Sequence, residues 1–130
     1  MNSYLLATSS LFMMIPAIIE ITNSLYILGI LTGTCSFCSA IMWLDYDNNT
    51  KRFLDRSLSR ITIVLYTIIY IYYDIVDGLL HFTTTYFLYK MSCIMYESGH
   101  KIWIVFHFIF HFFSLYTQLK LVNKYLLPAY

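Results

Sequence analysis

Two histidines, His107 and His111, lie four residues apart in an apolar stretch that begins at Ile102 and continues to Val122 with few polar residues. Side chains at positions i and i+4 share one face of a helix. About 20 apolar residues can cross a bilayer, and a titratable ring in hydrocarbon is costly, so the pair is a functional-site hypothesis. Two imidazoles at this spacing can bind one metal ion or pass a proton between rings. The structural alternative is a neutral pair bonded to Ser, Thr or Tyr on neighbouring helices.

Three further residues extend this candidate site. His100 precedes His107 by seven residues and therefore falls on the same helical stripe. Asp77 and His81 share a face of another apolar segment, and at 1.5 Å per residue His81 reaches a depth of about 10 Å from the opposite boundary. The sequence thus predicts a constellation of Asp77, His81, His107 and His111 that could carry a metal ion or protons.

The composition indicates the class of protein that holds these residues. The chain has 130 residues, of which 59% are hydrophobic and 12% charged, whereas a soluble domain carries about 25% charged residues. These values predict an all-α, polytopic transmembrane helical bundle forming a single domain over residues 1–130. A net charge of +1 provides no basic surface for nucleic acid. The expected partners are the lipid bilayer and other membrane subunits.

Five apolar segments approach the length of a bilayer crossing. They cover residues 4–21, 24–44, 57–73, 75–91 and 101–122, and the third and fourth meet at Asp74 in a predicted tight hairpin. No Lys or Arg precedes the first segment, so we interpret it as a span rather than a cleaved signal peptide. With five crossings, Lys120 and Lys124 lie on the C-terminal side of the membrane. Six basic residues lie on the N-terminal side: Lys51, Arg52, Arg56, Arg60, Lys90 and Lys101. This bias predicts an N-terminus inside and a C-terminus outside.

Small residues recur at helical spacing in the second segment, at Gly29, Gly33, Ser36 and Ala40. Such a stripe lets two helices approach closely within lipid. Cys35 and Cys38 in the same segment form a Cys-x-x-Cys motif. The motif is open to two readings, packing as small buried residues or thiol chemistry in the membrane.

Short motifs in the chain resemble those of the CREST superfamily, which includes alkaline ceramidases and progestin-type receptors. Ser39-Ala-Ile-Met-Trp43 followed by Phe53-Leu-Asp55-Arg56 is similar to that family's Ser-x-x-x-His and following Asp, and His100-Lys-Ile-Trp103-Ile104 is similar to its late His-x-x-x-His helix. The resemblance implies a helical bundle with an intramembrane zinc held by three His, where Ser and Asp support hydrolysis of a lipid amide.

The chain departs from that pattern at two ligand positions. Trp43 and Ile104 stand where the family has His, so this register keeps Ser39, Asp55 and His100 and loses two zinc ligands. His107-Phe-Ile-Phe-His111 supplies a late pair in a shifted register. The third ligand must then come from another group: Asp55, Asp45 or His81. The family also has seven helices where five are expected here.

Three functions are consistent with these patterns. The first is a non-catalytic structural or assembly component of a membrane or membrane complex. The second is a zinc-dependent hydrolase of a membrane lipid, with Ser39 and Asp55 catalytic and metal ligands drawn from His100, His107, His111, His81 and Asp77. The third is a proton or ion conduit along the His and Asp stripes.

Overall fold

The computed structural model describes residues 2–45 and 48–127, and every regular element in this part of the chain is a helix. The elements are α1 (Asn2–Leu11), α2 (Met14–Thr22), α3 (Tyr26–Leu44), α4 (Asn49–Tyr73), α5 (Ile75–Glu97), α6 (Trp103–Leu121) and the π-helical turn η1 (Val122–Leu126). The predicted all-α bundle is therefore confirmed.

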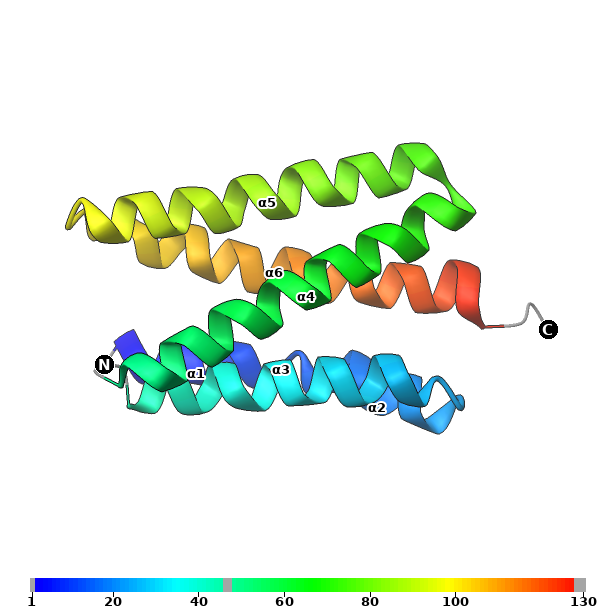
Figure 1. Ribbon diagram of the computed structural model, residues 1–130, viewed down its shortest axis with the longest axis horizontal. Coiled ribbons are helices and arrows are strands. Elements are labelled where there is room, and N and C mark those ends of the chain that lie inside the picture. The colour runs from blue at the N-terminus through cyan, green and yellow to red at the C-terminus, as the bar shows by residue number, and fades with distance from the viewer. Residues whose placement is uncertain (1, 46–47, 128–130) are drawn as a thin grey trace.

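The helices run up and down along one long axis (Figure 1). α1 and α2 follow one another as a single segment broken at Phe12 and Met13, so the described chain has five long helical segments. α3 packs against α1, α2 and α4, and α5 packs against α4 and α6. α4 crosses obliquely between the layer of α1, α2 and α3 and the pair of α5 and α6 (Figure 1), while α6 also contacts α1 and α2 and closes the bundle.

The connections fall at two opposite ends of the bundle (Figure 1). One end, called the α3–α4 end, gathers the start of α1, the end of α3, the start of α4 and the turn from α5 to α6. The other, called the α4–α5 end, gathers the turn from α2 to α3, Asp74 and η1. Asp74 alone connects α4 to α5, and its side chain accepts hydrogen bonds from the backbone N–H groups of Val76 and Asp77. A carboxylate at this position caps the start of a helix.

The helices differ in length from the apolar segments. α4 begins at Asn49 instead of residue 57 because two polar turns extend it, and the Asn48 side chain caps it by accepting from the Lys51 N–H. α5 continues to Glu97 instead of residue 91. α6 begins at Trp103, after Gly99 turns the chain with a φ of 72°. A positive φ is readily adopted by glycine.

The bundle buries many polar side chains together with apolar ones and leaves many large apolar side chains exposed, unlike a soluble domain. Ile27 and Tyr72 are each 81% exposed, whereas Glu20 is 0% and His81 is 4% exposed. Three helical segments, Ser3–Thr22, Tyr26–Leu44 and Trp103–Leu126, are long and apolar enough to cross a membrane. They correspond to the first, second and fifth predicted spans.

Small residues of α3 face α1 and α2, as the stripe predicted. A Cβ atom at Gly29 would lie 2.9 Å from the Ala17 carbonyl oxygen and 2.5 Å from Ile21 Cγ1. At Gly33 the nearest atom, the Ala17 Cβ, would be 3.6 Å away, which is ordinary contact. Close approach of α2 to α3 therefore depends on Gly29 more than on Gly33.

We expect Gly29→Ala to destabilise the bundle by about 1–3 kcal/mol, because the added methyl group meets a backbone oxygen that cannot move aside easily. Gly33→Ala is the matched control, and it should leave the stability unchanged or raise it by up to about 1 kcal/mol, because alanine is the better helix former. The measurement is unfolding by sodium dodecyl sulfate in mixed micelles, followed by circular dichroism. Equal losses in both variants would contradict this account of the helix contact.

Candidate functional site

Two cavities inside the bundle contain most of the candidate residues. The central cavity has a volume of about 50 Å³ and is lined by hydroxyl, imidazole and amide side chains, including Ser10, Ser39, Tyr66, His81, His111 and Gln118. The end cavity, near the α3–α4 end, has a volume of about 40 Å³ and is lined by charged and aromatic side chains, including Trp43, Arg52, Asp55, Arg56, Trp103 and His107.

The adjacent rings of His107 and His111 lie between these cavities, with their centroids 4.6 Å apart. The Nδ1 atom of His111 lies 2.7 Å from the Ser9 hydroxyl of α1. The Nδ1 atom of His107 lies 2.9 Å from the Ser92 hydroxyl of α5. Each ring therefore joins α6 to a different helix through a hydroxyl. These are the contacts expected when intramembrane histidines are neutral and structural.

His100 does not join this stripe. The prediction placed it at the start of the last helix, but the residue precedes α6 and is exposed. Gly99 adopts a left-handed conformation just before it, so the chain is still turning at His100. The helical spacing used to align His100 with His107 does not apply across this turn.

The predicted constellation of Asp77, His81, His107 and His111 is divided in the structure. His81 and His111 line the central cavity, whereas His107 lines the end cavity. Asp77 lies in the first turn of α5, 2.9 Å from the Lys120 Nζ and 3.3 Å from the Lys124 Nζ. Asp77 thus connects α5 to α6 and η1 through ion pairs.

His81 is buried with both ring nitrogens lacking a hydrogen-bond partner. Its ring stacks on Tyr70 with a centroid distance of 5.1 Å. Gln118, which lines the same cavity, is also buried with an unpartnered Oε1 atom. An unpaired polar atom in a buried site costs about 1–3 kcal/mol, so the central cavity is a place where water molecules would be stabilised.

The residues of the CREST-like motifs converge toward the α3–α4 end. The Ser39 hydroxyl is 3.1 Å from that of Ser10 and also interacts with the Asp55 carboxylate. Asp55 is 6% exposed, and the positive charge of the Arg56 guanidinium favours its ionised carboxylate. Trp43, at the position of the family's early His, lies edge-on to His107 with ring centroids 4.9 Å apart.

Residues able to bind a metal ion are dispersed in the described part of the chain. Within residues 2–45 and 48–127, no three side chains of His, Cys, Asp or Glu come close enough together to hold one ion. Asp55 and His107 line one cavity, and His81 and His111 line the other. The predicted zinc ligands His100, His107, His111, His81 and Asp77 thus form no single donor set here.

The sequence interpretation missed a buried carboxylate, Glu20. It is fully buried on α2 and accepts a hydrogen bond from the Tyr66 hydroxyl of α4, which lies 2.8 Å from the Thr32 hydroxyl of α3. Three helices therefore meet at one hydrogen-bonded chain. The signal was available, because Glu20 is the single acidic residue within the apolar stretch 4–21, and an acidic residue there is costly unless partnered.

Comparisons with protein-family models, with curated proteins and with solved structures found no match for this chain. The likeness to the CREST superfamily therefore depends on the short motifs and on how their residues are arranged.

We expect Tyr66→Phe to destabilise the bundle by about 1–3 kcal/mol, because the buried Glu20 carboxylate loses its phenol donor. Tyr86→Phe on exposed α5 surface is the matched control and should be close to neutral. Thermal unfolding in detergent, followed by circular dichroism, measures both. A Tyr66→Phe protein as stable as the control would show that this contact contributes little.

Proposed function

We propose that the chain is an integral membrane protein that crosses the bilayer five times and serves as a non-catalytic structural or assembly component. The observation that carries this proposal is the distribution of side chains, with Glu20, His81 and Gln118 buried and many large apolar residues exposed. A hydrocarbon surrounding makes such an exterior favourable over the whole length of a bundle.

The arrangement of the helix ends supports one orientation. The start of α4, the end of α5 and the turn before α6 share the α3–α4 end (Figure 1), and they contain the more basic connections. Lys120 and Lys124 belong to the opposite end. The positive-inside rule then puts the N-terminus inside and the C-terminus outside.

The contacts of the candidate residues support a structural role. Ser9, Ser39 and Ser92 engage residues of other helices, as do the two histidines of α6. Hydrogen bonds of this kind hold membrane helices together where lipid supplies no hydrophobic drive. The connections from α2 to α3 and from α4 to α5 are also short, so these turns add no domain for soluble chemistry.

The topology is tested with single cysteines. In a chain whose native Cys35, Cys38 and Cys93 are replaced by alanine, we expect Thr50→Cys and Ser98→Cys to react with a membrane-impermeant maleimide from the same side. Both should be protected in sealed cells and labelled after permeabilisation, because both lie on the inner side.

A cysteine at Ser24, in the turn from α2 to α3, is the matched control and should be labelled in sealed cells. Labelling of Thr50→Cys and Ser98→Cys from opposite sides would contradict the five-span arrangement.

A second candidate function is zinc-dependent hydrolysis of a membrane lipid. The observation that favours it is the convergence of motif residues, since Ser39 interacts with Asp55 while Asp55 and His107 line one cavity. Residues His100 and Asp77 lie outside both cavity linings, so a zinc ion would require His107 with Asp55 or another rearranged ligand.

Metal content separates the two functions. For a structural component we expect zinc far below one equivalent per purified chain, and no change in His107→Ala or His111→Ala. The measurement is elemental analysis by mass spectrometry after purification without chelators. One equivalent of zinc that is lost in His107→Ala would favour the hydrolase, whereas a stoichiometric membrane partner in the same preparation would support the assembly role.

A further inference from the structure

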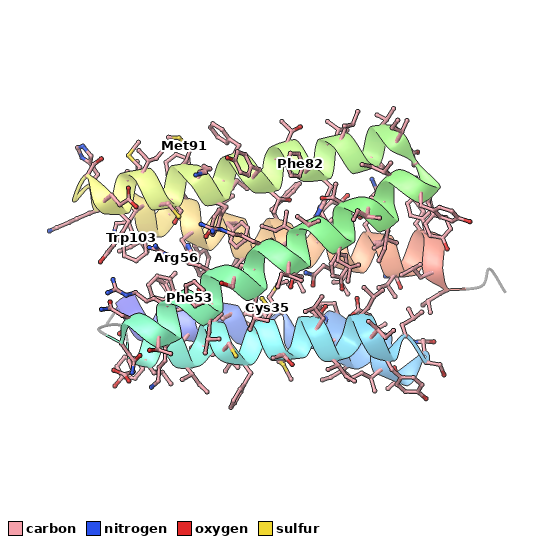
Figure 2. The ribbon with its side chains drawn as sticks, in the orientation of Figure 1. Cys35, Phe53, Arg56, Phe82, Met91 and Trp103 are labelled. Atoms are coloured by element: carbon pink, nitrogen blue, oxygen red, sulfur yellow. The ribbon has the colours of Figure 1, made fainter. Side chains whose placement is uncertain are left out.

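The end cavity combines charges of both signs with aromatic walls. Four helices, α3 to α6, contribute to it at the α3–α4 end, and Arg56 and Trp103 lie in the space between α4 and the pair of α5 and α6 (Figure 2). Asp55 supplies the negative charge, and Arg52 and Arg56 supply the positive charges. Such a combination matches a ligand that itself carries both charges.

Two hydrogen-bond acceptors in this cavity lack partners. The Oδ1 atom of Asp55 has none, and Asp55 is 6% exposed. The Nε2 atom of His107 also has none, while Nδ1 lies 2.9 Å from the Ser92 hydroxyl. When Nδ1–H donates to Ser92, Nε2 is an acceptor. Both atoms can then accept a hydrogen bond from a ligand, and leaving a buried acceptor unpaired costs free energy of folding.

A primary ammonium group meets these requirements. It carries a positive charge opposite Asp55 and three N–H donors, and the faces of aromatic rings attract cations. Trp43 and Trp103 stack beside this site with ring centroids 5.5 Å apart. The cavity volume of about 40 Å³ leaves room for a small number of water molecules, since one water needs about 10–15 Å³ of such space. A small cationic group can therefore enter it.

The two arginines indicate what is attached to that amine. Guanidinium groups pair readily with phosphate oxygens, and Arg52 and Arg56 line the same cavity as Asp55. On the topology proposed above, the α3–α4 end lies where lipid headgroups meet the hydrocarbon. We propose that the end cavity binds the phosphoethanolamine headgroup of a bilayer lipid, with the ammonium at Asp55 and the phosphate at Arg52 and Arg56. This inference rests on the proposed membrane location.

Intrinsic fluorescence reports directly on this cavity, because Trp43 and Trp103 are the two tryptophans of the chain and both line it. Full-length protein in detergent micelles is titrated with a short-chain phosphatidylethanolamine. We expect a saturable change in tryptophan emission. Phosphatidylcholine and phosphatidylglycerol of the same chain length should give at least a tenfold weaker response, because one lacks N–H donors and the other lacks the cation. Soluble phosphoethanolamine distinguishes a free metabolite from a lipid as the source of the headgroup.

Variants separate the two halves of the site. Asp55→Asn should weaken phosphatidylethanolamine binding at least tenfold, because the ammonium loses its charged acceptor. Arg56→Gln should weaken phosphatidylethanolamine binding while leaving the response to a long-chain primary amine unchanged. Asp45→Asn is the matched control, since Asp45 is exposed, pairs with Lys51 and does not line the cavity.

Equal responses to the ethanolamine and choline lipids, or undiminished binding by Asp55→Asn, would overturn the proposal. Circular dichroism and gel filtration establish that each variant remains folded, and Arg56→Gln carries the test if Asp55→Asn does not fold. Extraction of the cell membranes with alkaline carbonate tests the membrane location separately. A chain that stays in the membrane but shows no lipid selectivity refutes only the headgroup site.

Discussion

The bundle depends on polar side chains that find their partners on neighbouring helices. In hydrocarbon no water competes for these groups, so each unpaired atom costs more than it would at a protein surface. Glu20, Tyr66 and Thr32 join α2, α4 and α3, and Ser9 with His111 joins α1 to α6. These contacts fix which helices are neighbours, while glycine at position 29 fixes how closely two of them approach.

Several polar atoms that lack such partners line two cavities in the interior. The central one is lined by hydroxyl groups and holds His81 and Gln118 with unpartnered atoms, and the other holds Asp55 near the basic turns of the α3–α4 end. His107 and His111 lie between the two cavities, and their Nδ1 atoms form hydrogen bonds with serine hydroxyls on two different helices. A residue that would be a metal ligand in another bundle here serves to connect helices.

The helical class and the approximate positions of the helices could be predicted because they depend on apolar length and local spacing. The face shared by His107 and His111 was predictable for the same reason. The place of His100 was not, because the turn at Gly99 interrupts the spacing. The partners of Asp77 were also missed, since Lys120 and Lys124 are more than forty residues away and are brought near by tertiary contact alone. Glu20 was visible as an isolated charge, but its donor on α4 could not be inferred from spacing.

The connection through the single residue Asp74 has a consequence for how the chain enters a bilayer. α4 and α5 are not among the segments apolar enough to cross unaided, and their polar ends point away from the turn. A connection of one residue does not allow α4 and α5 to take up positions independently of one another. In the five-span arrangement proposed above, the two helices would have to insert together as one hairpin, so lengthening this connection would uncouple their insertion.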